Sequence, residues 1–419
     1  MAGNLAAIDR RQVLRNSALL GGLAVLPGAA ALAAAPGPAA AAAAGARPHL
    51  APLRVSPDQL IDLKCCLRPL RAAGPNLSAQ QVGDALVIHN YGHGGSGWSL
   101  SWGSAEIAVG KAMTVLPSRI AVVGCGIIGL TSAIVAQRAG LAVTIYAREM
   151  IQRTRSFRAS GSFTPDSRIA LREPAGAAFG DTWEQMARLS WKAFRTMLGL
   201  PGNPVEFSDS YAVSNEPIVR RVWTPDPAIT EAWKPGGLPK QNSEFAHYNE
   251  RIKDMVPQAV PLSAEENPFP AFAYAQRTSS MHFNFADYAH LLLSEFFARG
   301  GRFVARDFHA PAELGRLPEK VVIHATGYAA RDLWDDRTVM PVRGQTGWLV
   351  PQVEANYGLR YKNASVLSKS DGVVVMNNPT EEGEMFGVGD SLELPDRAPI
   401  EEAMALIAEV FRARPEIRP

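Results

Sequence analysis

The clearest pattern of hydrophobic positions in this chain begins at Ile120. A short apolar run, Ile120–Val123, precedes a glycine loop, and apolar residues at helical spacing then continue to Gly140. A second apolar run, Leu141–Tyr146, follows directly. Short runs of branched apolar residues are typical of buried strands, and apolar residues three or four positions apart are typical of helices. The pattern therefore predicts a strand, a tight turn, a helix and a second strand.

Similar patterns recur on both sides of this unit. Before it, Leu86–His89 predicts a strand, Gly92–Gly97 a glycine loop, and Ser104–Met113 a helix. The remaining predicted helices cover residues 181–198, 281–301 and 398–411. The remaining predicted strands cover residues 303–307, 321–325, 348–351, 365–368, 373–376 and 384–388, the last four as an antiparallel set.

This order of elements predicts an α/β fold. We expect a Rossmann-like nucleotide-binding domain and a mixed α+β second domain that contains an antiparallel sheet. A chain of 419 residues is long for a single core, and its 47% of hydrophobic residues is enough for ordinary globular burial.

The glycine loop carries the first chemical signal. Gly124, Gly126 and Gly129 have the G-x-G-x-x-G spacing of a dinucleotide-binding turn, in which the first glycine permits the turn, the second admits a pyrophosphate and the third allows close helix packing. The helix that follows offers unpaired N–H groups to phosphates. Glu149 lies where an acidic side chain usually meets the ribose hydroxyls. The strand–loop–helix–strand context favours this reading over a glycine-rich turn in another kind of α/β protein.

Charge and cysteine content exclude several other classes of protein. The formal net charge is +2, and no basic patch with interleaved aromatic residues indicates a nucleic-acid partner. The three cysteines, Cys65, Cys66 and Cys125, cannot form a disulfide framework, and we interpret them as small buried residues. No spacing of His, Cys or acidic residues indicates a metal site. A homodimer is compatible with the sequence, which does not specify the oligomeric state.

The N-terminal segment has the composition of an export signal. Arg10 and Arg11 precede an apolar stretch, Ala18–Ala35, that resembles a twin-arginine signal with a small-residue cleavage site. Glycine and alanine dilute this stretch, so it is a weak candidate for a stable membrane span. We therefore expect export through the twin-arginine route to the periplasm or the extracellular space. The alternative is an Ala-rich tail without a targeting role.

Two segments before the dinucleotide turn resemble the D-amino-acid oxidase family of flavoenzymes. They are Leu67–Arg71, with the sequence LRPLR, and His89–Gly97, with the sequence HNYGHGGSG. In most members these motifs lie near the C-terminus, after the dinucleotide turn. The order of segments here therefore looks circularly permuted. The permutation predicts that the helix at 398–411 ends close to the segment Arg54–Gln59.

Three later segments extend the resemblance. Thr154–Pro165 is similar to the family's stretch that covers the flavin, Val321–Gly327 to its return to the flavin domain, and Pro341–Gln345 to the segment that leads out again. The resemblance implies the following organisation: a signal and Ala/Pro-rich linker at 1–46, the FAD-binding domain at 52–165, the first part of the substrate domain at 166–280, a return to the FAD-binding domain at 281–345, the second part of the substrate domain at 346–397, and a closing helix of the FAD domain at 398–419.

The resemblance also implies a cofactor and a reaction. The cofactor would be FAD, and the α-hydrogen of an amino acid would leave as hydride to flavin N5, with oxygen as the final acceptor. Arg68 would bind the α-carboxylate and the Gly95 carbonyl would face the amine. N–H groups around Gly94–Trp98 would meet the flavin's pyrimidine edge. The residues expected to bind FAD are Gly94, Gly95, Ser96, Gly97, Trp98, Ser99, Gly124, Cys125, Gly126, Ile127, Ile128, Gly129, Arg148, Glu149, Thr154, Gly161, Thr326 and Gly327.

Some residues of the two motifs are expected to hold the structure rather than to react. We interpret His89 and His93 as hydrogen-bonding residues that hold the glycine loop. Arg71 is expected to be structural.

Two departures from the family leave alternatives open. Arg148 stands where many relatives have an acid, and an arginine there also suits the 2′-phosphate of NADP. The family usually has a tyrosine at the start of the strand that begins at Val373, and its contact to the substrate carboxylate would come from elsewhere, with Tyr357 and Tyr361 as candidates. A related oxidase of glycine, N-methylated or cyclic amino acids and a non-catalytic flavin-binding relative are therefore the alternatives to D-amino-acid oxidation. L-stereochemistry also stays open.

Overall fold

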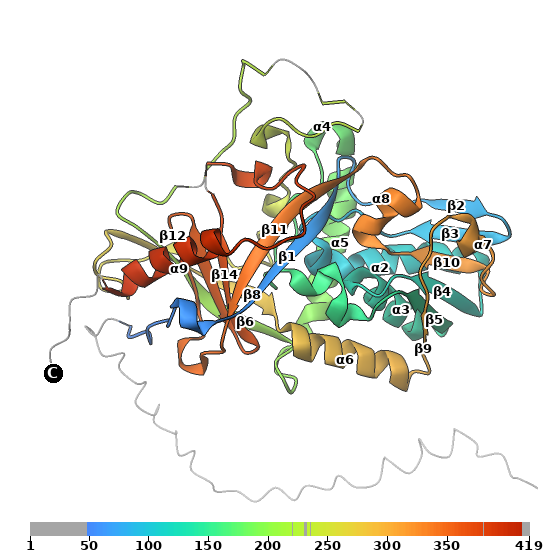
Figure 1. Ribbon diagram of the computed structural model, residues 1–419, viewed down its shortest axis with the longest axis horizontal. Coiled ribbons are helices and arrows are strands. Elements are labelled where there is room, and N and C mark those ends of the chain that lie inside the picture. Colours follow the sequence, from blue (N-terminus) through green and yellow to red (C-terminus); the bar gives the residue numbers. More distant parts are fainter. Residues whose placement is uncertain (1–47, 220, 230–232, 235, 380, 413–419) are drawn as a thin grey trace, which may run out of the picture. The chain divides into compact units, whose positions relative to one another are not determined.

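The computed structural model describes residues 48–219, 221–229, 233–234, 236–379 and 381–412. The predicted export signal lies in residues 1–47, outside the described residues. The described residues belong to one compact unit. Its strands make up a six-stranded sheet and an eight-stranded sheet (Figure 1).

The six-stranded sheet is the predicted nucleotide-binding fold. Its strand order is β2 (Ala79–Val82), β3 (Ala85–His89), β10 (Val321–His324), β4 (Arg119–Val123), β5 (Ala142–Ala147) and β9 (Arg302–Ala305). All neighbouring pairs are parallel except β2 and β3. Helix α2 (Gly97–Ala112) and helix α3 (Ile127–Arg138) connect the strands and pack against each other and the sheet. The α/β prediction and the unit around Gly124 are confirmed.

Hydrophobic residues on both faces hold this sheet between layers. Ile88, Val122 and Ile323 point to the face covered by α2 and α3, whereas their neighbours Val87 and Ala121 belong to the core on the opposite face. Side chains of successive strand residues point to opposite faces, so a parallel strand buried on both sides is apolar throughout. This is why the strands appear in the sequence as continuous hydrophobic runs.

Two long helices and several short ones accompany the six-stranded sheet and its two connecting helices. Helix α5 (Phe179–Arg195) contacts α2, and α6 (Phe285–Ala298) contacts α3. Three helices have four residues each: α4 (Arg172–Ala175), α7 (Ala312–Gly315) and α8 (Ala330–Leu333).

The eight-stranded sheet is mostly antiparallel. Its order is β1 (Leu60–Arg71), β11 (Val339–Leu349), β14 (Gly372–Asn377), β13 (Ala364–Lys369), β12 (Gly358–Tyr361), β6 (Val205–Ser214), β8 (Tyr274–Phe283) and β7 (Val260–Pro261). Only β12 and β6 run parallel. The long strands β1 and β11 lie side by side (Figure 1), with Arg68 opposite Val342 and Cys66 opposite Gly344.

Helix α9 (Arg397–Arg412) was expected to close the FAD-binding domain, and it packs on the other sheet instead. It contacts β11, β12, β13 and β14 of the eight-stranded sheet. The apolar face formed by Ile400, Met404 and Ile407 shares a core with Leu53 and Val55. The helix and the chain segment before β1 therefore contribute to one hydrophobic core.

The helix predicted at 104–113 begins earlier, at Gly97, and the strand predicted at 348–351 is the end of the longer strand β11. Two further predictions differ more strongly from the structure. The helix expected from Met281 begins only at Phe285, because Met281–Phe283 complete β8 in register with Phe207 and Val205 of β6. The Asp371 carboxylate accepts the N–H of Phe285 at 2.6 Å and so marks the helix start. The strand expected at 384–388 is a turn around Gly383 and Gly387, both with positive φ, and only Val388 pairs with a strand residue, Val342.

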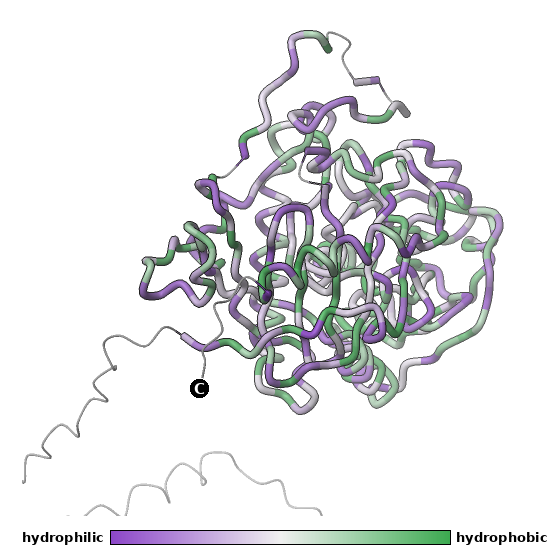
Figure 2. The backbone as a smooth tube through the Cα atoms, turned by 60° about the vertical axis from the view of Figure 1, so that its left-hand side comes forward, coloured by the Kyte–Doolittle hydropathy of each residue, from purple (hydrophilic) through white to green (hydrophobic). Residues whose placement is uncertain are grey.

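Hydrophobic and hydrophilic residues alternate along much of the chain (Figure 2). Within the described residues no helix has the length and apolar character needed to cross a bilayer. The same residues contain no group of three or more His, Cys, Asp or Glu arranged to hold a metal ion. The three cysteines are buried and free, as expected.

Candidate active site

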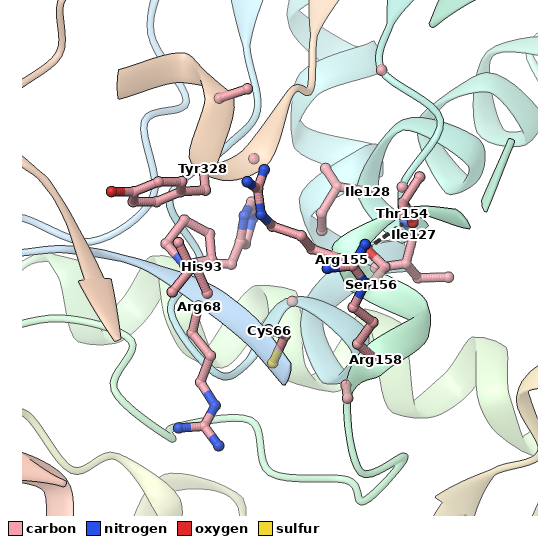
Figure 3. Close-up of a pocket in the computed structure, with 18 of the residues that line it drawn as sticks. Cys66, Arg68, His93, Ile127, Ile128, Thr154, Arg155, Ser156, Arg158 and Tyr328 are labelled. Atoms are coloured by element: carbon pink, nitrogen blue, oxygen red, sulfur yellow. Dashed lines mark hydrogen bonds between the residues drawn. The ribbon is translucent and has the colours of Figure 1, made fainter. Parts of the chain in front are cut away.

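A cavity of about 970 Å³ lies where the two sheets meet. One side is formed by residues that follow β4, β5 and β10, at the carboxyl ends of the parallel strands, and the other by residues of β1 and β11. In open α/β sheets ligands bind at the carboxyl ends of the strands. Figure 3 shows Ile127, Thr154 and Ser156 gathered on one side and Arg68 on the other, with its guanidinium directed away from them.

The dinucleotide turn is built for close approach of a ligand. Gly124 has φ +110°, and a side chain there would collide with the Ala325 carbonyl. Gly129 packs against the Gly124 carbonyl, which brings α3 close to β4. A Cβ on Gly126 would lie 2.9 Å from Ser156 Oγ, and this oxygen accepts the N–H of Ile127 at 3.2 Å. The start of α3 therefore offers N–H groups to an acceptor on the cavity side.

Cys125 is part of the same turn. Burial raises the pKa of its thiol to about 12. It is therefore a neutral group that fills space beside the cavity.

The residues directly after β5 include both charged residues that the sequence predicts to bind FAD. Arg148 and Glu149 line the cavity after β5. Arg148 lies 3.9 Å from the carboxylate of Asp307, and both side chains are largely exposed. The guanidinium of Arg148 therefore already has a carboxylate neighbour, that of Asp307.

Two buried histidines hold the glycine-rich loop after β3. His89 Nδ1 is 3.0 Å from His324 Nδ1, and His324 Nε2 is 2.7 Å from the hydroxyl of Thr326, which lines the cavity. Burial lowers the pKa of His89 to about 4, although Asp336 raises it, and lowers the pKa of His324 well below its ordinary value. Both rings are neutral near pH 7, and the contact of His89 fits its predicted role of holding the loop; His324 is a partner that the sequence interpretation did not name.

His93 anchors the loop to α2. Its Nε2 is 2.7 Å from the Ser104 hydroxyl, and burial lowers its pKa to about 3. Ser104 in turn donates to Asn90, and Asn90 donates to Ser132 of α3 at 3.1 Å. This buried network ties the loop to both helices of the nucleotide-binding fold.

The loop uses part of its N–H groups within the protein. Gly94 N–H donates to the Pro69 carbonyl at 2.8 Å, Gly95 N–H to the Ser167 carbonyl at 2.9 Å, and Ser96 N–H to the His93 carbonyl at 2.9 Å. The N–H groups without an intrahelical acceptor are those at the start of α2, from Gly97 onward. Of the N–H groups predicted to meet the flavin, around Gly94–Trp98, those of Gly97 and Trp98 are therefore the ones left for a ligand.

Most predicted site residues meet in this one cavity. Those that line it are Arg68, Gly94, Gly95, Gly97, Trp98, Gly124, Cys125, Gly126, Ile127, Ile128, Arg148, Glu149, Thr154, Gly161, Thr326 and Gly327. Three do not. The Ser96 hydroxyl donates to the Ser167 carbonyl, the Ser99 hydroxyl accepts the N–H of Thr164, and Gly129 is enclosed in the packing of α3 on β4.

Arg68 is the predicted carboxylate-binding residue, and its surroundings suit that role. Its guanidinium lies over Gly344 of β11, where a side chain would collide with Nη2. Its Nη1 atom is buried and has no hydrogen-bond partner in the part of the chain that the structure describes. A buried cationic donor of this kind is stabilised by an anionic acceptor. Arg71 is structural, since its guanidinium pairs with Asp336 at 3.2 Å.

Tyr357 and Tyr361 do not supply the missing tyrosine contact. The Tyr357 hydroxyl donates to the Ala51 carbonyl at 2.7 Å, and both rings belong to the core under α9. Neither residue lines the cavity.

The sequence interpretation missed a group of charged residues on the cavity wall. Glu393, in the segment before α9, binds Arg155 through a two-pronged contact and Arg158 at 3.1 Å. Burial would raise the pKa of Glu393, but the hydrogen bonds and charges of Arg155 and Arg158 outweigh it and lower the pKa. Arg168 is a further missed residue. Only the density of arginines over residues 153–158 signalled this group in the sequence.

Comparison with known proteins identifies a protein family that matches this chain. The family described as FAD dependent oxidoreductase matches residues 119–418. The chain is 26% identical over 230 residues to a D-amino-acid oxidase of Streptomyces coelicolor, which covers 54% of this chain and 57% of that protein. It is 48% identical over 52 residues to a D-aspartate oxidase of Cryptococcus neoformans, 12% of this chain and 13% of that protein. The chain thus spans less than two thirds of either curated relative.

Solved structures give a weaker likeness. An L-amino acid deaminase from Proteus vulgaris, lacking its specific insertion sequence, superposes with a TM-score of 0.43 at 16% identity and covers 71% of this chain and 76% of its own. A glycine oxidase from Geobacillus kaustophilus gives 0.39 at 11% identity, with 62% and 70% covered.

Proposed function

Because this chain belongs to the family of FAD dependent oxidoreductases, with FAD as its cofactor, we propose that it oxidises D-amino acids to 2-oxo acids. Ammonia and hydrogen peroxide are the other products, with oxygen as the electron acceptor and water hydrolysing the imino acid. The observation that carries the proposal is that one cavity contains both the dinucleotide turn and Arg68, whose Nη1 has no hydrogen-bond partner among the described residues. The names of the two curated relatives support the D series.

The cavity fits FAD at the dinucleotide turn. Gly124 and Gly126 leave open the space next to the first N–H groups of α3, where a pyrophosphate is bound in such folds. Glu149 and Gly97 line the same cavity; Glu149 would meet the ribose, and the first N–H groups of α2 would meet the flavin's pyrimidine edge. Ligand cavities span roughly 300–1,000 Å³, so this volume suits a ligand as large as a dinucleotide.

FAD, when bound, accepts a hydride from the substrate carbon. The protein's part is to bind and orient the substrate. Arg68 holds the carboxylate through a two-pronged contact, and the Gly95 carbonyl accepts a hydrogen bond from the amine. No side chain acts as acid or base in this scheme.

Replacing Arg68 tests the proposal. A charged hydrogen-bonded contact contributes ~1.5–3 kcal/mol, so Arg68→Met should lower kcat/KM by roughly 10- to 150-fold, and Arg68→Lys by less. Arg54→Met is the matched control, because Arg54 is exposed and pairs only with surface Glu354 within the described contacts. An unchanged kcat/KM in Arg68→Met would remove this residue from the site.

Two other functions have specific motivations. The absence of the family's tyrosine at Val373 favours an oxidase of glycine, N-methylated or cyclic amino acids, and a substrate panel distinguishes it. The same absence motivates a non-catalytic flavin protein, in which no amine would reduce the bound flavin.

We also propose that the segment order is circularly permuted. The family match begins at residue 119, after Arg68 and the glycine loop, and α9 shares a core with Leu53 and Val55. A rearranged chain in which residues 48–118 follow residue 412 should fold and bind FAD. Failure of this chain to bind FAD would contradict the permutation.

Export through the twin-arginine route remains a proposal based on Arg10, Arg11 and the apolar stretch after them. Replacing both arginines with lysine should retain the protein in the cytosol. Export unaffected by the replacement would refute the proposal.

A further inference from the structure

Arg168 is a second arginine in the same chamber as Arg68. It lies in the segment after Pro165 and lines the cavity, and its backbone has the left-handed φ of 50°. The segment is fixed against the glycine loop, because a Cβ on Gly94 would occupy the position of the Arg168 carbonyl. The adjacent Ser167 carbonyl accepts the N–H of Gly95 at 2.9 Å. The backbone of Arg168 is therefore positioned by the loop that faces the substrate amine.

The side chain of Arg168 is also held in place. Nε donates to the Glu384 carbonyl at 2.9 Å and Nη2 to the Gly383 carbonyl at 3.0 Å. Nη1 lies 3.3 Å from the Glu384 carboxylate, and the side chain is only 11% exposed. Two nitrogens are thus bound to backbone carbonyls. An arginine fixed in this way loses little conformational entropy when it binds a ligand.

Arg168 lies within electrostatic range of Arg68 and of Glu384. Arg68 and Arg168 are both cationic, and Glu384 is the carboxylate paired with Arg168. Burial and the charge of Arg68 lower the pKa of Arg168 to about 10, against the opposing effect of Glu384, so Arg168 stays charged near neutral pH. Asp166 is a second buried carboxylate in this region, and burial, together with the charge of Glu384, raises its pKa. Among the described residues, Arg68 Nη1 has no hydrogen-bond partner.

We propose that Arg168 binds the substrate carboxylate together with Arg68, as a second guanidinium contact. The inference rests on the amino-acid oxidation proposed above. It assigns to this buried arginine the contact that the family's tyrosine would make and that Tyr357 and Tyr361 do not provide. It also favours ligands that carry a carboxylate, because Arg168 already pairs with Glu384 whereas an amide or a simple amine would leave the buried Arg68 Nη1 without an anionic acceptor.

Carboxylate binding can be measured without turnover. Benzoate is titrated into the FAD-loaded protein while the visible spectrum of the flavin is followed, and benzamide serves as the neutral probe. Arg168→Met should weaken benzoate binding by about 10- to 150-fold, as expected for a charged hydrogen bond, and leave benzamide binding unchanged. Arg168→Gln is the second variant, since its amide can still donate to the 383–384 carbonyls without the charge. Arg172→Met is the control, because Arg172 is exposed on the same segment and does not line the cavity.

The outcomes separate this inference from the proposed function. Equal benzoate affinity in the unmodified protein and both Arg168 variants would overturn the role of Arg168. Loss of FAD binding or of cooperative unfolding in both variants would assign it a structural role and also overturn the inference. Weaker benzoate binding in both variants, with FAD affinity kept, supports it. If benzoate binding depends on Arg168 but no amino acid reduces the flavin, the oxidase proposal fails alone.

Discussion

Gly126→Ala is a direct perturbation of the predicted pyrophosphate site. Gly126 is the N-cap of α3 with φ −71° and ψ −178°, an extended conformation that alanine adopts without strain. The new methyl group would lie 2.9 Å from Ser156 Oγ, and its next contact is at 3.9 Å. Ser156 Oγ would have to move by about 0.5 Å to reach the 3.4 Å of an ordinary contact. The conflict is therefore confined to one atom.

The loss of FAD affinity expected from this substitution follows from the hydrogen bond that Ser156 Oγ accepts. Ser156 Oγ accepts the N–H of Ile127, and the Ser156 carbonyl is fixed by the indole N–H of Trp98 at 2.8 Å. The hydroxyl can therefore move only by rotating away from the helix start. A neutral hydrogen bond contributes ~0.5–1.5 kcal/mol, and the methyl group also occupies space beside the N–H groups meant for phosphate. We expect the FAD dissociation constant to rise about 5- to 30-fold, which corresponds to ~1–2 kcal/mol.

The assay is titration of the apoprotein with FAD, followed by flavin fluorescence. Gly110→Ala is the control, because no atom lies within 4 Å of the added methyl group and alanine favours the helix. Adding Ser156→Ala to Gly126→Ala should cause little further loss, since it removes the oxygen that conflicts. An FAD affinity of Gly126→Ala equal to that of the unmodified protein would refute the reasoning.

The remaining predictions concern stability. Burial lowers the pKa values of His89, His93 and His324. Below pH 6.5 the unfolded chain therefore takes up protons that the folded chain does not. The folded state loses stability as the pH falls from 6.5 towards about 4 for His89 and about 3 for His93. Each contributes ~1.4 kcal/mol per pH unit in its window, and equal urea midpoints at pH 7.5 and pH 5 would contradict this. Glu393→Gln should lower the free energy of unfolding by ~1 kcal/mol through the loss of its ion pairs with Arg155 and Arg158, a loss that shrinks in high salt. Glu402→Gln, an exposed change on α9, is the control in thermal unfolding, and a loss independent of salt would contradict the ion-pair explanation.

Local patterns predicted the nucleotide-binding half of the fold well. The strand at Ile120, the turn at Gly124 and the helix from Ile127 depend on residues close together in the sequence, and all three are observed. The predicted start of α6, at Met281, was wrong because apolar residues continue from β8 into the helix. Only the pairing of Met281 with Phe207, far away in the sequence, shows where the strand ends.

The placement of whole elements could not be derived from pattern. The apolar face of α9 predicts burial of one side of the helix, but the sequence does not say which sheet covers it. Charged groups on the cavity wall were missed for the same reason. Arg168 and Glu393 lack a motif, and their roles depend on tertiary contacts with Glu384 and Arg155.

The most direct test of amino-acid oxidation is the visible spectrum of the purified, FAD-loaded protein under argon. A panel of D-amino acids and L-amino acids is added, and the flavin absorbance is followed. We predict bleaching by D-amino acids and recovery of the yellow colour when oxygen is admitted. Bleaching by the L series alone would contradict the proposed stereochemistry, and a flavin that no amino acid reduces would contradict the proposed function.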